Sequence, residues 1–274
     1  MNAIPPSPGS VSVAALLRWH LEAGVDETIS DAPINRYAPL PAAAGVKPVA
    51  HVTAPLAPPR PAFPAAAEAG VSATHIAQGC RTLADLRAAV EAFDGCALKT
   101  FASRTVFADG NADAKVMIVG EAPGEDEDRQ GLPFVGVSGK LLDRMLASIG
   151  LDRARNAYIT NIVFWRPPGN RKPTAEEVAL CLPFVQRHIE LVDPALLILL
   201  GGPAANTLLA NPQGITKLRG RWFTYETPGL PRPVPAMATF HPAYLLRSPQ
   251  QKRLAWRDLL TIKAKLGEVM PATP

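Results

Sequence analysis

The chain has few cysteines and no long apolar run. Its three cysteines, Cys80, Cys96 and Cys181, are an odd number without a close pair, which argues against a disulfide framework and for a reducing compartment. No stretch reaches the roughly 18 uninterrupted apolar residues of a membrane span. The N-terminus lacks the basic segment and apolar core of a signal peptide. These absences predict a cytoplasmic protein without a membrane partner.

Two common phosphate-binding motifs are also missing from a glycine-rich turn. The segment GEAPGEDEDRQGLPFVG follows an apolar run, but no Gly-Lys-Ser/Thr follows it and no G-x-G-x-x-G opens a helix. Its five carboxylates would repel phosphate. Three explanations for these carboxylates remain open. They could form a solvated acidic loop, bind a metal ion, or stabilise a cation that develops during a reaction.

Charge gives only a mild indication of the partner. Lys and Arg total 28 against 24 Asp and Glu, with a formal net charge of +4 and a pI near 9.1. This balance leans slightly towards polyanions, and a slightly basic globular surface explains it equally well.

Proline is abundant, with 29 residues, and its clustering divides the chain. Residues 1–31 contain a short amphipathic helix over 12–24, residues 32–71 form a Pro/Ala-rich disordered linker, and 72–274 form a compact domain. The N-terminal helix either docks a protein partner or packs back on the domain.

The compact domain alternates strands with helices. Helices are predicted over 82–93, 138–150, 174–192, 202–210 and 248–267, and strands over 115–120, 156–165, 195–201, 221–226 and 234–240. This alternation predicts an α/β fold: a three-layer α/β/α sandwich with a mostly parallel central sheet. Ligands bind such sheets outside the carboxyl ends of the strands, so Glu121, Asn161 and His241 should converge there.

Each of these residues also has an ordinary explanation. His241 suits a hydrogen-bonded turn, Asn161 a turn after a strand, and Phe134 the core. Asn161 can also present a donor and an acceptor together, as reading a base edge requires, and Phe134 can serve as a stacking platform.

Three long segments resemble one family. GEAPGEDEDRQGLPFVGVSGKLLDRML, YITNIVFWRPPGNRKPTAEEV and HPAYLLRSPQQKRLAWRDL are together similar to the family 4 uracil-DNA glycosylases, in the right order over about residues 83–266. The resemblance implies a monofunctional hydrolase of base excision repair. Such an enzyme hydrolyses the N-glycosidic bond of deoxyuridine in DNA and leaves an abasic site, and it requires the base to leave the stack.

The resemblance also assigns catalytic roles. It implies that Glu121 activates water, that Asn161 hydrogen-bonds the uracil edge, that His241 serves the leaving group, and that uracil stacks on Phe134. A carboxylate can stabilise an oxocarbenium-like sugar, and a donor can stabilise the departing uracil anion.

Further substrate contacts follow from the same match. Glu127 lies where the family crowds out the 5-methyl group of thymine. Backbone amides of Gly120, Ala122 and Gly136 are expected to donate to uracil or a phosphate. Asp126 is the second candidate, after Glu121, for the general base that activates water.

DNA contacts are expected from the segment after His241 and from the RPPGNR loop. An apolar wedge would fill the gap left by the flipped base, for which Tyr244, Leu245 and Leu246 are candidates, although Leu246 suits a helix core equally well. Phosphate contacts are expected from three arginines: Arg166, Arg171 and Arg247.

The resemblance fails at the family's [4Fe–4S] cluster. Cys96 and Cys181 match two of its four cysteine positions, but Phe93 and Trp165 stand at the other two. We expect no cofactor, with both aromatic rings filling the cluster's volume; ligation through Cys80 and a histidine stays open.

The sequence thus predicts a monomeric, nucleoid-associated bacterial enzyme whose partner is uracil-containing DNA. Two alternatives remain: a non-catalytic DNA-binding or scaffold protein on the same fold, and a flavodoxin-like or metal-dependent hydrolase of a small substrate.

Overall fold

A computed structural model describes residues 66–269 of the chain. The predicted N-terminal helix over 12–24 and most of the predicted linker lie outside these residues. Helix α2 (Ala66–Gly79) begins before the expected domain start at residue 72. The described domain therefore includes the last residues that were assigned to the linker.

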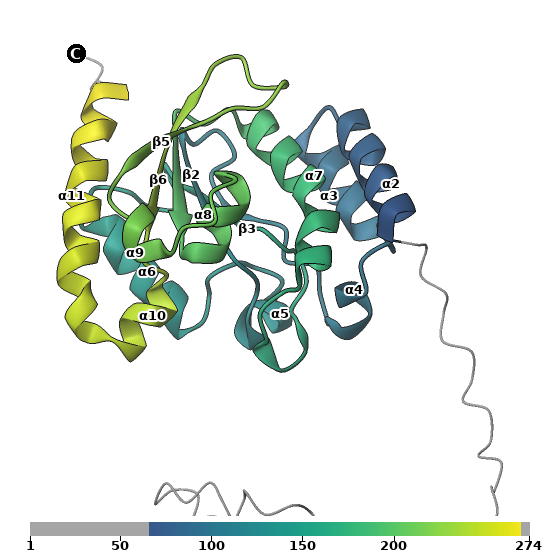
Figure 1. The fold of residues 1–274 in the computed structure, drawn as a ribbon, viewed down its shortest axis with the longest axis horizontal. Coiled ribbons are helices and arrows are strands. Elements are labelled where there is room, and N and C mark those ends of the chain that lie inside the picture. Colours follow the sequence, from purple (N-terminus) through teal and green to yellow (C-terminus); the bar gives the residue numbers. More distant parts are fainter. Residues whose placement is uncertain (1–65, 270–274) are drawn as a thin grey trace, which may run out of the picture. The chain divides into compact units, whose positions relative to one another are not determined.

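A six-stranded, mostly parallel sheet forms the centre of this domain, as predicted (Figure 1). Its strands are β1 (Asp109–Gly110), β2 (Val116–Gly120), β3 (Tyr158–Asn161), β4 (Leu196–Leu200), β5 (Trp222–Tyr225) and β6 (Val234–Thr239). Their order is β1-β3-β2-β4-β6-β5. The four inner strands are parallel, and β1 and β5 pair antiparallel at the two edges.

The central strands read as apolar runs because helices cover both faces of the sheet. Every residue of β2 and β4 is buried. Met117 and Val119 point into one apolar cluster, and Val116 and Ile118 point into the other, as the two-residue period of a strand requires.

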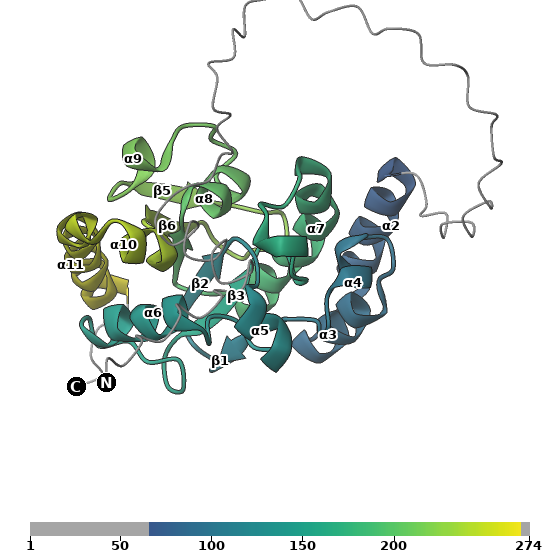
Figure 2. The same ribbon diagram turned by 90° about the horizontal axis from the view of Figure 1, so that it is seen from below.

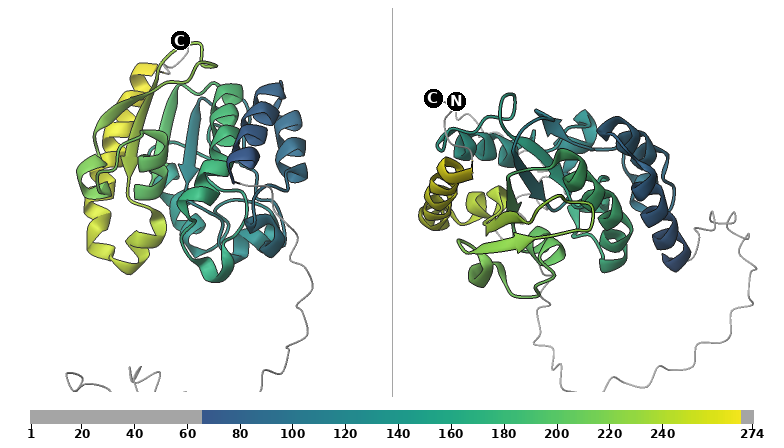
Figure 3. Two further views of the ribbon diagram at one scale, coloured as in Figure 1. Left: turned by 45° about the vertical axis from the view of Figure 1, so that its right-hand side comes forward. Right: turned by 90° about the horizontal axis from the view of Figure 1, so that it is seen from above.

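Helices complete the two outer layers. They are α3 (Leu83–Ala92), α4 (Leu98–Phe101), α5 (Glu125–Gln130), α6 (Val137–Ala147), α7 (Ala175–Val192), α8 (Gly202–Leu208), α9 (Ile215–Leu218), α10 (Pro242–Arg247) and α11 (Lys252–Val269), with 3₁₀ turns at Pro168–Asn170 and Pro249–Gln251. Helices α6 and α11 lie on one side of the sheet, and α7 and α8 lie on the other (Figure 2). Helices α2 and α3 pack against α7 (Figure 3). None of the helices described is long and apolar enough to cross a membrane.

Local sequence signals set several element ends as predicted. The Thr174 hydroxyl accepts a hydrogen bond from the Glu177 amide at 3.2 Å, and the Glu177 carboxylate accepts one from the Thr174 amide at 2.7 Å. This capping box starts α7.

One predicted strand end was wrong, and one open alternative for the acidic segment is not what the structure shows. Strand β3 ends at Asn161, four residues before the predicted end, and the apolar residues 162–165 that follow it are buried in the core. Burial, rather than strand pairing, explains why these four residues are apolar. The acidic residues form α5 and not the solvated loop that was one of the open alternatives, because Asp and Glu favour the first turn of a helix.

Candidate active site

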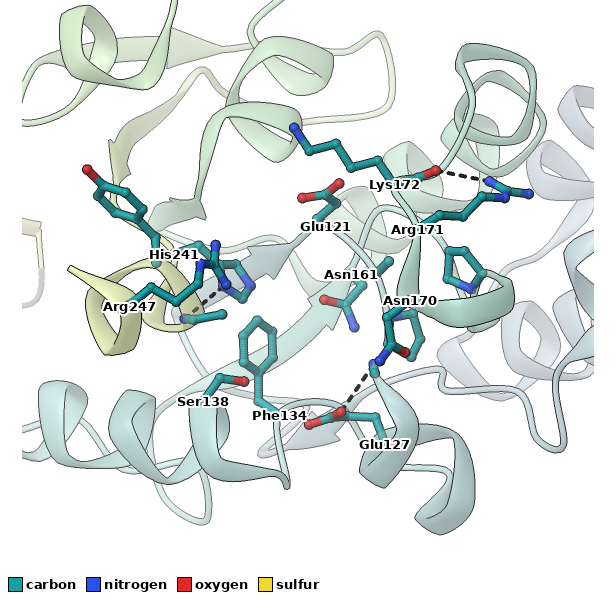
Figure 4. A pocket seen from close by; sticks show the side chains of 16 residues that line it. Glu121, Glu127, Phe134, Ser138, Asn161, Asn170, Arg171, Lys172, His241 and Arg247 are labelled. Carbon is teal, nitrogen blue, oxygen red and sulfur yellow. Dashed lines mark hydrogen bonds between the residues drawn. The ribbon is translucent and has the colours of Figure 1, made fainter. Parts of the chain in front are cut away.

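A cavity of about 410 Å³ opens at the carboxyl ends of β2, β3 and β6. Glu121 follows β2, Asn161 ends β3, and His241 caps α10 just after β6. All three line the cavity together with Phe134, and Figure 4 shows their side chains gathered around it. The predicted convergence of these strand ends is therefore confirmed.

Gly120 lets the floor of the cavity form. It pairs in register with Asn161 across β2 and β3. A Cβ atom at Gly120 would collide with the Asn161 side-chain oxygen and would lie 2.7 Å from Cε2 of the Phe134 ring. Only glycine at position 120 allows the Asn161 amide and the Phe134 ring to lie this close to the backbone of β2.

Asn161 lines the cavity and carries a buried acceptor without a partner in the described part of the chain. Asn161 is 1% exposed, and its Oδ1 atom has no hydrogen-bond partner within residues 66–269. A buried polar atom without a partner is costly and is rare in folded proteins. A ligand or water that brings a donor to Oδ1 would remove this cost.

His241 is held as a neutral imidazole whose free proton lies on Nε2. Burial, aided by the positive charge of Arg247, lowers the pKa of His241 to about 4. The Ala243 amide donates to Nδ1 at 3.2 Å, so the single proton of the neutral ring resides on Nε2. The His241 ring centroid lies 5.5 Å from that of Phe134. The histidine is thus a hydrogen-bond donor beside the aromatic floor.

Glu121 is half-buried in the same cavity. Burial raises the pKa of its carboxyl group, and the positive charge of Lys172 opposes that shift. Lys172 also lines the cavity. It is the next residue after the predicted RPPGNR loop, and the adjacent basic pair of Arg171 and Lys172 was the signal that sequence reasoning missed.

The other acidic residues of the glycine-rich segment have separate partners. Asp126 pairs with Arg129 at 2.5 Å and Glu125 with Arg166 at 3.2 Å, while Asp128 accepts the backbone amides of residues 103 and 104. Within residues 66–269, no three His, Cys, Asp or Glu side chains are grouped to hold a metal ion. This dispersal disfavours a metal site in the segment, and Asp126 does not line the cavity.

Glu127 is 7% exposed and is bonded to the backbone. Its carboxylate accepts hydrogen bonds from the amides of Gly124 at 3.1 Å and of Val135 and Gly136 at 2.9 Å each. The Gly136 amide is therefore engaged by Glu127, contrary to the expectation that it donates to uracil or a phosphate. Glu127 and Ala122 both line the cavity, as do Ser138 and Asn170, which sequence reasoning missed.

The predicted DNA-contact residues do not all reach the cavity mouth. Arg247, Tyr244 and Arg171 line the cavity. Leu246 is 38% exposed, whereas Leu245 is 1% exposed and packs in the core. The prediction of Leu245 as a DNA wedge is wrong for this conformation, because α10 turns that side chain towards α6 and α11.

Two predicted phosphate contacts are paired within the protein. Arg171 donates to both carboxylate oxygens of Glu177 at 2.8 and 2.6 Å. Arg166 donates to Glu125 at 3.2 Å and to Asn170 at 2.8 Å, and it does not appear among the residues that line the cavity. DNA phosphates would have to compete with these carboxylates.

The geometry defines a class of protein. An α/β sandwich with an aromatic floor, an unpartnered amide and a neutral imidazole at its strand ends is suited to hold a planar, polar ring such as an extruded base, as DNA glycosylases do.

Comparisons with known proteins give the family. A family model described as the uracil DNA glycosylase superfamily matches residues 107–260, and the chain belongs to this superfamily. It is 38% identical over 177 residues to a type-4 uracil-DNA glycosylase of Saccharolobus solfataricus, covering 63% of this chain and 81% of that protein. It is 42% identical over 164 residues to one of Archaeoglobus fulgidus (59% and 82% covered) and 38% identical over 172 residues to one of Thermotoga maritima (62% and 86% covered).

The region of the family's iron–sulfur cluster does not fit a four-thiolate site. Cys96 and Cys181 are both buried, and the neighbouring Cys181 thiol lowers the pKa of Cys96. Phe93 packs edge-on against Phe184 with ring centroids 5.1 Å apart. Trp165 is 1% exposed.

Trp165 and Cys80 also form hydrogen bonds within the protein. The Trp165 indole donates to the Thr105 hydroxyl at 3.0 Å, and the Cys80 thiol donates to the Ile76 carbonyl at 3.3 Å. Because a [4Fe–4S] cluster takes four thiolates, the residues present do not fit the group.

Proposed function

We propose that this uracil-DNA glycosylase excises uracil from DNA through the cavity lined by Glu121, Phe134, Asn161 and His241. It hydrolyses the N-glycosidic bond of deoxyuridine and leaves an abasic site. One observation carries the proposal: the buried Asn161 Oδ1 has no hydrogen-bond partner in the part of the chain that the structure describes, and the buried ring of Phe134 lines the same cavity.

Uracil matches this amide. Its N3–H is a donor between two carbonyl acceptors, so Oδ1 of Asn161 accepts from N3–H while Nδ2 donates to O4. Cytosine presents an acceptor at N3, which would leave Oδ1 facing a lone pair. The ring of Phe134 supplies the stacking surface, and Glu127 and the loop it holds close the cavity against the methyl group of thymine.

His241 stabilises the leaving group. As the bond breaks, negative charge develops on the departing uracil, and the Nε2–H of the neutral imidazole donates to its O2 atom. A donor aimed at developing charge in a water-excluded site is worth more than in water. A full proton transfer from His241 is not required.

Glu121 acts on the opposite charge. The sugar becomes oxocarbenium-like, and an ionised carboxylate stabilises it and orients the attacking water. Lys172 favours the ionised form of Glu121 and opposes the effect of burial.

The remaining expectations stay proposals. Tyr244 and Leu246 fill the gap in the duplex and Arg247 contacts phosphate, while Arg166 and Arg171 would have to exchange their carboxylate partners for phosphates. Phe93 and Trp165 support an enzyme without a cluster. We also propose that the domain acts as a monomer on nucleoid DNA in the cytoplasm. Residues 1–31 dock a partner, and the linker over 32–71 tethers them to the domain.

The test is excision from a short oligonucleotide with one uracil. We expect alkali-labile cleavage at the uracil, and a loss of cleavage in Asn161→Ala that exceeds any loss of affinity for uracil-free DNA. Binding without cleavage by the parent protein would favour the scaffold alternative instead.

A further inference from the structure

Phe134 holds an unusual backbone conformation. Its φ is +55°, in the left-handed region that bulky residues rarely adopt. Such a conformation persists only where the surrounding structure enforces it. At Phe134 this conformation turns a large ring into the cavity, where it is 4% exposed.

Arg153 binds backbone carbonyl groups in the loop that contains Phe134, between α5 and α6. It lies between α6 and β3, and its guanidinium donates to the carbonyl of Phe134 at 2.8 Å and to that of Pro133 at 3.1 Å. Asp109, at 2.7 Å, and Asp143, at 2.7 and 2.9 Å, fix the guanidinium in turn. This fork uses all three nitrogens of Arg153, which one lysine amine cannot reproduce.

Two other groups hold the loop from its remaining sides. The Glu127 carboxylate accepts the amides of Val135 and Gly136 at 2.9 Å each. Gly139 of α6 lies against the Phe134 carbonyl so closely that a Cβ atom there would overlap it. The peptide groups on both flanks of Phe134 are thus fixed. Within residues 66–269, Arg153 is the only side-chain donor to the Phe134 carbonyl.

We propose that Arg153 is a positioning residue for uracil, acting through the backbone of Phe134. Arg153 is absent from the cavity lining, so it does not touch the substrate. The inference rests on the proposed function, in which uracil stacks on Phe134. It predicts that losing the Arg153 fork lets the strained loop relax and moves the stacking ring.

The experiment compares Arg153→Met, Arg153→Lys and a matched control, Arg187→Met. Arg187 also donates to a backbone carbonyl, that of Cys80 at 2.8 and 2.9 Å, and to a carboxylate, Glu190 at 3.0 Å, but it is not part of the cavity lining. Single-turnover excision, inhibition by free uracil, affinity for uracil-free duplex and Tm are measured for each full-length protein.

We expect Arg153→Met to slow excision by roughly 10- to 100-fold, the scale of a small misplacement in an active site. Its inhibition by free uracil should weaken, while affinity for uracil-free duplex stays at the parental value. Arg153→Lys should recover part of both losses, and Arg187→Met should lower Tm without either loss. In a Phe134→Ala background, Arg153→Met should add no further loss of uracil inhibition, because coupled sites are not additive.

Several outcomes would overturn the inference. They are a folded Arg153→Met with parental excision and uracil inhibition, an equal loss in Arg187→Met, or a full additional loss in the Phe134→Ala background. If Arg153→Met does not fold, a folded Arg153→Lys that matches the parent in excision and uracil inhibition overturns it. A parent protein that fails to excise uracil overturns the proposed function and this inference with it, whereas failure in the variants alone leaves the proposed function standing.

Discussion

Replacing His241 with alanine removes the donor that we place at the leaving uracil. The imidazole is neutral, since its pKa is about 4, and its Nε2–H is free because Nδ1 accepts from the Ala243 amide. A preorganised donor of this kind contributes roughly 2.7–4 kcal/mol to the transition state, so excision should slow by about 100- to 1,000-fold.

The assay is single-turnover excision from a labelled duplex with one uracil, measured from pH 5 to pH 9. His241 stays neutral across this range because its pKa lies below it, so the ratio of parental to His241→Ala rates should be constant. Binding to uracil-free duplex, which depends on phosphate contacts, should be unchanged. His75→Ala, an exposed histidine of α2, is the matched control and should behave as the parent.

Two results would refute this reasoning. Parental excision by a folded His241→Ala would show that no donor acts there. A parental rate that changes near pH 6.5, with that change lost in His241→Ala, would show that the imidazole titrates at its ordinary value and acts as a charged acid.

Four other predictions address the site and the fold. Glu121→Gln should slow excision by at least about tenfold. It should also remove the fall in the parental excision rate at low pH, whose midpoint should lie above the ordinary carboxyl pKa of 4.5 because burial raises the pKa of Glu121. If the variant keeps the same fall in rate, another group is responsible for it. Gly120→Ala should abolish uracil inhibition while the protein stays folded, since a methyl group there overlaps the Asn161 amide and the Phe134 ring; retained inhibition would contradict this geometry. Burial lowers the pKa of His188 to about 3, so as the pH falls the unfolded state binds a proton at this residue before the folded state does. The free energy of unfolding should therefore decrease by about 1.4 kcal/mol for each pH unit of acidification from pH 6.5 to pH 3. Urea titrations of the parent and of His188→Leu should show a weaker acid dependence in the variant. Protein purified without oxygen should be colourless, with iron well below one atom per chain, and absorbance near 400 nm with stoichiometric iron would contradict the cluster-free proposal.

Local pattern was sufficient for most of the fold and for the main site residues. Apolar runs such as 196–200 can be satisfied only by burial on both faces, and the Thr174–Glu177 capping box is a local hydrogen-bond arrangement. Parallel strands end at one edge of a sheet, and by this rule the sequence alone groups Glu121, Asn161 and His241.

Tertiary structure alone decided what each side chain faces. The carboxylates of α5 look alike in the sequence, yet Glu127 binds three backbone amides while Glu125 pairs with Arg166. Leu245 and Leu246 are adjacent, and the packing of α10 buries one and exposes the other. The proton position on His241 and the support of Phe134 by Arg153 depend on single hydrogen bonds. Arg153 and Phe134 are separated along the chain by α6, so no local periodicity carries the information about their contact.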